Sequence, residues 1–211
     1  MKDFGISNIF RKLNFILVIL SQSGCGNLVG STNSTACVLG GTCKIFITTG
    51  TYSGDLGGIQ GADEICNSDL GRPRDGNTYK ALLSDGISRV ACTSANCAKG
   101  PKENTGWVVF PNTHYVDKNA NLIVTSSPLG IWNNGALSNF LNSDHLSKKN
   151  TSLWTGLSSD FTASASNCNQ WTSSSGSQSA ATSSTDSEQI PQFGVSTPCS
   201  DISNALICVE Q

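Results

Sequence analysis

Nine cysteines in a chain of 211 residues constrain this protein more than any other feature of its sequence. Cys25 follows an apolar N-terminal stretch, and the other eight cysteines lie after it. The residues before Cys25 combine a basic start with an apolar run from Leu13 to Leu20. That pattern is typical of a signal peptide and is too short to span a bilayer. If Cys25 is lipidated, the remaining even number of cysteines indicates a disulfide framework in an exported domain.

The sequence divides into three parts. Residues 1–24 are predicted to be the signal peptide, and residues 25–43 a lipidated N-terminus and flexible tether of small polar residues. Residues 44–211 are enough for one hydrophobic core and hardly for two. A short bridge between Cys37 and Cys43 would lie in the tether, so we expect it to contribute little to the core.

The charge of the predicted mature chain narrows the choice of partner. Residues 1–24 hold three of the 13 Lys and Arg and one of the 15 Asp and Glu, which leaves 10 positive and 14 negative charges, a net charge of −4. This balance argues against a nucleic-acid partner. The positive side chains are scattered and form no dense basic stripe, so partner binding should depend on loop hydrogen bonds and a few aromatic anchors. The scattered pairs are Arg72 and Arg74, Lys99 and Lys102, and Lys148 and Lys149.

Residue patterns predict an α+β domain of short antiparallel strands, one or two helices and long loops. The β-branched and aromatic residues of 44–49 predict a first strand. Residues 59–70 place apolar side chains, including Cys66 and Leu70, on one helical face, with Gly71 as the C-cap. A short strand or the start of a helix is predicted at 79–83. Further strands are predicted at 106–111, 152–157 and 205–209, with a hairpin over 113–125.

A serine- and threonine-rich run near the C-terminus is the candidate ligand surface. From Thr172 to Ser187, 11 of 16 residues are Ser or Thr, which predicts a long surface loop that buries no core. Trp171 lies at its base and Phe193 near its end, and Trp132 is a third candidate aromatic contact. The alternative is that this run is only a solvated insertion.

Motifs for catalysis or metal binding are missing from the sequence. Neither His114 nor His145 lies in a metalloprotease or nucleophile-elbow motif, and clustered carboxylates are absent. The close spacings of Cys37 to Cys43 and Cys92 to Cys97 favour short disulfides, since zinc-binding thiolates would be oxidised outside the cell. We therefore expect a protein that is not an enzyme and holds no cofactor or metal.

The stretch GDLGGIQGADEIC, from Gly54 to Cys66, resembles the leptospiral endostatin-like surface lipoproteins of the DUF1554 type. Residues 154–157, 167–171 and 205–210 agree with that family, and the resemblance covers about residues 44–210. It implies a fold shared with endostatin and the C-type lectin domains.

The resemblance also implies two of the disulfides. Eight cysteines permit 105 pairings, so their spacing alone cannot choose among them. In the related folds an early helical cysteine pairs with the last one, and this bridge encloses a second. The expected bonds are Cys66–Cys208 and Cys168–Cys199 by resemblance, and Cys92–Cys97 and Cys37–Cys43 by proximity.

Function is implied by the resemblance alone. Members of the family are described as adhesins for host extracellular matrix proteins, such as laminin and fibronectin, and as binders of complement regulators such as factor H. This implies a host–pathogen role for a lipoprotein anchored in the outer membrane at the cell surface. The alternative is a structural or unassigned envelope lipoprotein without a host ligand. A calcium-dependent lectin is disfavoured because the sequence around Cys168 lacks the expected carboxylate ligands, and a secreted hydrolase because catalytic motifs are missing.

We predict that the mature chain begins with a lipid-modified Cys25. Ser23 and Gly24 are the small residues expected before such a cysteine, although Gln22 stands where an aliphatic residue is usual. Mass spectrometry of the mature N-terminus should show the lipid on Cys25. An unmodified Cys25, or cleavage at another position, would refute the prediction.

Overall fold

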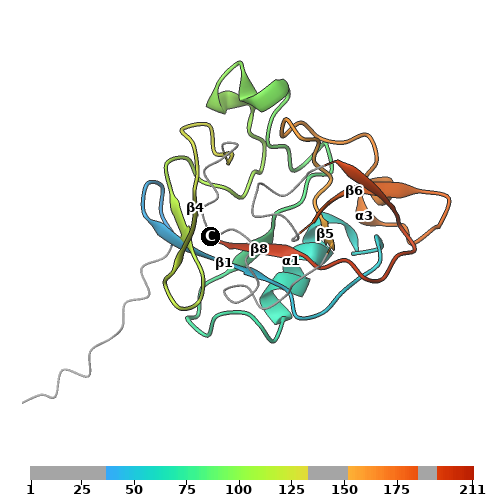
Figure 1. Cartoon of the computed structure of the whole chain (residues 1–211), viewed down its shortest axis with the longest axis horizontal. Coiled ribbons are helices and arrows are strands. Elements are labelled where there is room, and N and C mark those ends of the chain that lie inside the picture. Colours follow the sequence, from blue (N-terminus) through green and yellow to red (C-terminus); the bar gives the residue numbers. More distant parts are fainter. Residues whose placement is uncertain (1–36, 133–151, 185–193) are drawn as a thin grey trace, which may run out of the picture. The chain divides into compact units, whose positions relative to one another are not determined.

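The computed structural model describes residues 37–132, 152–184 and 194–211 (Figure 1). All of these residues belong to one compact unit, Ser34–Gln211. Two sheets, a helix of eleven residues and a second single-turn helix make this unit an α+β domain, as the sequence predicts. No helix in the described ranges is long and apolar enough to cross a membrane.

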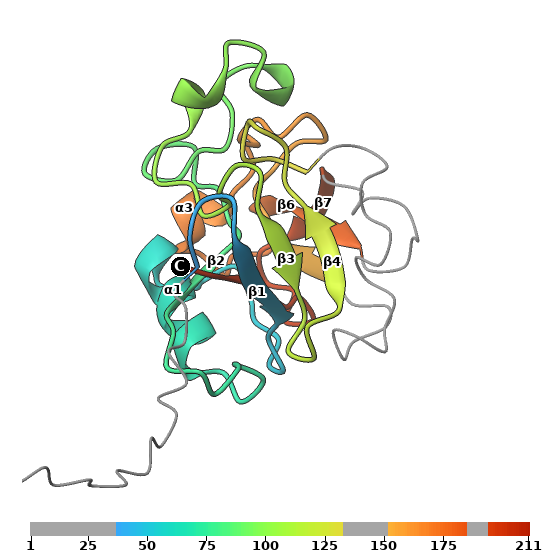
Figure 2. The same cartoon turned by 90° about the vertical axis from the view of Figure 1, so that its left-hand side faces the viewer.

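The larger sheet has five strands, and the first and last strands in the sequence of the domain lie next to each other inside it. β1 (Thr42–Ile47) pairs in parallel with β3 (His114–Val116) through its first half and antiparallel with β8 (Ile207–Glu210) through its second half. The β-branched and aromatic residues of β1 suit this central position, because Ile45, Phe46 and Ile47 are all buried. Figure 2 shows β1, β3 and β4 (Leu122–Thr125) side by side. The strand order is β2 (Tyr79–Ala81), β8, β1, β3 and β4.

The smaller sheet contains β5 (Ser152–Trp154), β6 (Ser179–Ser184) and β7 (Val195–Pro198), all antiparallel, with β6 in the middle. The prediction of a featureless surface loop is therefore wrong for β6, whose Thr182 is buried. The Thr182 hydroxyl lies 3.1 Å from the carbonyl oxygen of Val195 and 3.0 Å from the Thr197 hydroxyl. Small hydroxyl side chains can enter a core when their oxygens find such partners.

Helix α1 (Gly58–Ser68) carries the predicted apolar face, and Ala62 and Cys66 on it are buried. The helix ends earlier than predicted because Asp69 adopts an extended backbone, with φ −65° and ψ 142°. Gly71 is therefore not the C-cap, and its N–H donates to the Asp69 carboxylate at 2.7 Å. Leu70 falls outside the helix and is 92% exposed, so its assignment to the buried face is wrong.

Residues 107–110 are buried in part but form no regular strand, which corrects the strand predicted at 106–111. Val108 and Val109 lie in the core, while the Trp107 indole donates to the carbonyl oxygen of Gly130 at 2.8 Å. The predicted hairpin over 113–125 is present as β3 and β4.

The connection between β2 and β3 contains two short 3₁₀ turns, η1 (Ala95–Cys97) and η2 (Pro101–Glu103). The Glu103 carboxylate holds them together by accepting hydrogen bonds from the N–H and hydroxyl groups of Thr93 and Ser94. Burial alone would raise the pKa of Glu103, but the hydrogen bonds from Ser94 and Thr93 outweigh it and lower the pKa to about 2. Glu103 is therefore a structural carboxylate.

Four disulfides staple the domain, and they are the pairs expected from spacing and resemblance: Cys37–Cys43, Cys66–Cys208, Cys92–Cys97 and Cys168–Cys199. The expectation that the first bridge contributes little to the core is wrong. Cys43 lies in β1, and both Cys37 and Cys43 are buried in the hydrophobic core. The domain therefore includes the end of the segment assigned to the tether.

We predict that the Cys66–Cys208 bridge stabilises the domain most. The bonded residues are 142 positions apart, against 5 for Cys92–Cys97. In the chain-entropy model, replacing both cysteines with alanine should cost about 5 kcal/mol for the long loop and about 2 kcal/mol for the short one. Urea unfolding of the two double variants under non-reducing conditions measures the difference, and equal losses would contradict the prediction.

Candidate functional site

The motif that carries the resemblance packs directly on the inner disulfide, Cys168–Cys199. The Gly54 N–H donates to the carbonyl oxygen of Cys199 at 2.8 Å, and the Leu56 N–H donates to that of Trp171 at 2.9 Å. A Cβ atom added to Gly54 would lie 2.2 Å from the Cys168 sulfur. Glycine is therefore required at position 54 by close packing, and the motif has a structural role.

The segment after Cys168 is an unusual turn, α3 (Cys168–Trp171), in which all four residues have positive φ angles. Such a left-handed conformation costs roughly 1–2 kcal/mol for each residue other than glycine. Asn167 helps to hold it, since its side chain accepts a hydrogen bond from the Gln170 N–H at 3.0 Å and donates one to the Asp85 carbonyl at 2.9 Å. The turn leaves Asn169 and Gln170 exposed.

Two aromatic residues predicted to contact a ligand are buried. Trp171 packs edge-on against Trp154 with ring centroids 5.8 Å apart, and its indole donates to the carbonyl oxygen of Ser84 at 2.9 Å. Trp132 is only 1% exposed. The interpretation of these two rings as surface anchors is therefore wrong, because both fill the core. Phe193 lies outside the described residues.

Residues 174–178 of this region are exposed, and so is most of strand β7, at the edge of the smaller sheet. Val195 on β7 is 47% exposed, and Ser196 and Pro198 are also exposed. Cys199 follows β7 directly and is buried in the inner disulfide. Among the described residues no further strand pairs with β7, so its outer edge is open, and the disulfide fixes the end of the strand.

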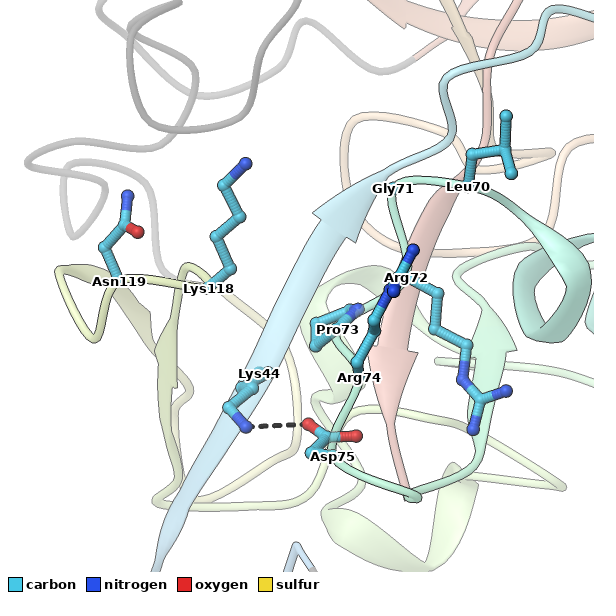
Figure 3. A pocket seen from close by; sticks show the side chains of 9 residues that line it. All are labelled: Lys44, Leu70, Gly71, Arg72, Pro73, Arg74, Asp75, Lys118 and Asn119. Atoms are coloured by element: carbon cyan, nitrogen blue, oxygen red, sulfur yellow. Dashed lines mark hydrogen bonds and ion pairs between the residues drawn. The ribbon is translucent and has the colours of Figure 1, made fainter.

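A second surface feature is a hollow of about 410 Å³ that four basic side chains line, called the basic hollow below. Figure 3 shows Lys44 on β1 between the β3–β4 turn, which carries Lys118, and the loop that carries Arg72 and Arg74. Asp75 is the single acidic residue of the lining, so the four cations and one anion give it a net charge of +3. The whole lining consists of Lys44, Leu70, Gly71, Arg72, Pro73, Arg74, Asp75, Lys118 and Asn119.

The four cations are not equivalent. Arg72 is held beneath the loop, where its guanidinium donates to the carbonyl oxygens of Asn67 at 3.0 Å and Asn77 at 2.5 Å. Arg74 and Lys118 are exposed, and neither makes a hydrogen bond or ion pair to another residue in the described part of the chain. These two side chains are therefore the ones free to meet an anion.

Lys44 belongs to a polar network beside the basic hollow. Its ammonium group lies 2.7 Å from the Asp75 carboxylate, which also accepts a hydrogen bond from the Tyr79 hydroxyl at 2.9 Å. Burial would raise the pKa of Asp75, but the hydrogen bonds from Lys44 and its neighbours outweigh it and lower the pKa. Burial raises the pKa of Glu210, whose carboxylate accepts hydrogen bonds from the Lys44 N–H and the Asn77 amide. Asp75 thus stays ionised and fixes Lys44 at the wall of the hollow.

One comparison with known proteins identifies the family. The model of a family of unknown function, DUF1554, matches residues 49–188. This chain is a DUF1554 protein. No curated protein matches it significantly. The matched range contains the motif from Gly54 to Cys66 and three of the four cations of the basic hollow.

The basic hollow of this DUF1554 domain was not predicted from the sequence, in which the positive charges look scattered. In the β1–β3 register Lys44 pairs with Val116, two residues before Lys118. This parallel pairing brings together cations that are far apart in the chain, and only the neighbours Arg72 and Arg74 gave a local signal. The expectation of scattered charge is therefore wrong for this surface.

The described residues of the DUF1554 domain include no group of three or more His, Cys, Asp or Glu side chains that could hold a metal ion. His114 is exposed on β3, with its Nδ1 atom 2.8 Å from the Thr125 hydroxyl. His145, like Cys25, lies outside the described residues.

We predict that Gly54→Ala destabilises the domain. The added Cβ meets the buried Cys168–Cys199 bridge, which cannot move away, so we expect a loss of about 1–3 kcal/mol, typical of overpacking. Gly176→Ala is the matched control, because its nearest neighbour would be the Ser200 hydroxyl at 3.2 Å, the end of a flexible side chain. Urea unfolding measures both, and equal stability of the two variants would contradict the packing argument.

Proposed function

We propose that this DUF1554 protein is a surface-exposed lipoprotein adhesin of the outer membrane. It would bind host extracellular matrix proteins such as laminin and fibronectin, or complement regulators such as factor H. The resemblance to the leptospiral endostatin-like proteins, and through them to the endostatin and C-type lectin folds, supports this proposal. Membership of the DUF1554 family agrees with it but names no function.

The covalent structure also supports the proposal. Four disulfides are typical of a domain that has been exported to an oxidising compartment. A lipid on Cys25 would then hold the domain at the membrane through the predicted tether. Together these features favour a protein that works outside the cytoplasm.

The observation that carries the adhesin proposal is the open edge of strand β7. An edge strand presents unpaired backbone N–H and C=O groups, which an extended segment of a partner can pair with. The exposed Val195 adds an apolar contact there. Cys199, which follows the strand directly, is bonded to Cys168. Because this bond already restricts the strand, little conformational entropy is lost when a partner binds to it.

The carboxylate of Asp85, whose backbone carbonyl accepts a hydrogen bond from Asn167 beside the inner disulfide, weighs against a calcium-dependent role. The Asp85 carboxylate accepts hydrogen bonds from the Ile87, Ser88 and Arg89 N–H groups, each at 2.9 Å. Burial would raise the pKa of Asp85, but the hydrogen bonds from Ser88 and these N–H groups lower it. Its oxygens are thus engaged by its own turn.

We predict that Val195→Lys on β7 weakens binding to the host ligand by about tenfold or more, because a charge on an edge strand opposes strand addition. Leu122→Lys is the matched control, since Leu122 is an aliphatic residue on an edge strand of the other sheet and is 42% exposed, close to the 47% of Val195. Solid-phase binding of the mature protein to laminin, fibronectin and factor H measures the effect.

The outcomes separate the adhesin from its alternative. If the unmodified protein binds none of the three ligands, the chain is better described as a structural or unassigned envelope lipoprotein. If it binds but both lysine variants behave alike, the site lies away from β7. Surface proteolysis of intact cells is a second check, because a protein that faces inward cannot be an adhesin.

A further inference from the structure

We propose that the basic hollow, with Leu70 at its rim, docks the domain on the anionic surface of a lipid membrane. This site is separate from the β7 edge and needs no host protein. Its argument rests on charge, on an exposed apolar residue and on where the chain enters the domain.

The charge of the basic hollow is concentrated beyond what the composition suggests. The chain has 13 Lys and Arg, of which five lie outside the described residues, so four of the remaining eight line this one hollow. The same chain has a formal net charge of −2. A local charge of +3 on an acidic chain means that the charge of the domain is distributed asymmetrically. The face with the hollow is attracted to anionic lipid headgroups, and the rest of the surface is repelled by them. The five residues are Lys2, Arg11, Lys12, Lys148 and Lys149.

Leu70 supplies the apolar contact that a membrane interface requires. At 92% it is more exposed than any other large hydrophobic residue in the described ranges. Its position is fixed, because the preceding Asp69 carboxylate accepts hydrogen bonds from the Thr49 N–H at 2.9 Å and the Gly71 N–H at 2.7 Å. An exposed leucine that shares a surface with cations, as Leu70 does with Arg72 and Arg74, is typical of segments that insert into the headgroup region, whereas a soluble polyanion would gain nothing from it.

The chain enters the domain beside the basic hollow. Cys37 is bonded to Cys43, and Lys44 of the hollow is the next residue. From Cys25 to Cys37 the chain can reach at most about 40 Å when fully extended. If Cys25 carries a lipid, as the proposed function states, Cys37 stays within that distance of the membrane, and the tether raises the effective concentration of the adjacent hollow there.

Docking through this face is compatible with the proposed adhesin role. Figure 1 shows β1 and β4 on one side of the domain and β6 on the other. A membrane at the basic hollow therefore leaves the sheet that contains β7 accessible to a partner. The two sites would act together, one setting the orientation of the domain and the other binding the host ligand.

The test uses the full mature chain with Cys25→Ser, which removes the lipid and leaves the eight bonded cysteines. We expect it to cosediment with vesicles of equal parts phosphatidylglycerol and phosphatidylcholine, and not with phosphatidylcholine alone. The double variant Arg74→Gln/Lys118→Gln should bind about 25-fold more weakly, since each basic residue near an anionic surface contributes about fivefold. Lys99→Gln/Lys102→Gln is the matched control, because these are also two exposed cations but do not line the hollow.

A second variant separates insertion from simple charge attraction. Leu70→Ser should weaken vesicle binding while leaving its dependence on salt unchanged, because it removes apolar contact and no charge. The side chains of Leu70, Arg74, Lys99, Lys102 and Lys118 are exposed, so near-ultraviolet circular dichroism should stay the same and confirm that the variants fold.

Several outcomes would overturn the proposal. They are equal binding by the Arg74/Lys118 and Lys99/Lys102 variants, binding to phosphatidylcholine alone, or no vesicle binding at all. Binding of a sulfated oligosaccharide or an acidic peptide that depends on Arg74 and Lys118, without vesicle binding, would assign the hollow to a soluble polyanion. Because the assay contains no host protein, its failure leaves the adhesin proposal unaffected.

Discussion

The last strand of the chain, β8, lies between β1 and β2, and its Cys208 is bonded to Cys66 of helix α1. The larger sheet can form only after the chain has returned to its own beginning, since the central β1 pairs with β8 through Ile45 to Ile47. Such long-range pairing carries a large loop-closure entropy. The Cys66–Cys208 bond reduces that entropy in the unfolded chain, so a domain with short strands and long connections can remain ordered.

An ion pair between the buried Arg89 and the partly buried Asp63 completes the link between α1 and the sheet. Arg89 is buried, and its guanidinium binds both carboxylate oxygens of Asp63 on α1, at 2.7 and 2.8 Å. The same two side chains also bond to the backbone of Ala81 on β2. A largely buried charge pair of this kind stabilises little by itself, but the loss of one partner would leave an uncompensated charge. It therefore fixes the position of α1 over the sheet.

With the core fixed, the surface divides into regions of different chemistry. The basic hollow gathers cations from β1, from the loop after α1 and from the β3–β4 turn. The β7 edge instead presents small polar side chains and Val195 above the inner disulfide. The motif from Gly54 to Cys66 contacts both the left-handed turn at Cys168–Trp171, through Leu56, and Cys199 at the end of β7, through Gly54. The motif thus maintains the scaffold.

Local residue patterns were enough to predict the class of fold, the first and last strands, helix α1 and the β3–β4 hairpin, because alternation and helical spacing are properties of neighbouring residues. Burial depends on distant partners. Trp171 looked like an exposed anchor beside a polar run, but Ser84 and Trp154 enclose it, and the polar run itself supplies the buried strand β6. The basic hollow depended on tertiary structure in the same way. Arg72 and Arg74 are neighbours in sequence, but Lys44 and Lys118 join them only because β1 and β3 pair in parallel, and no local pattern encodes that register.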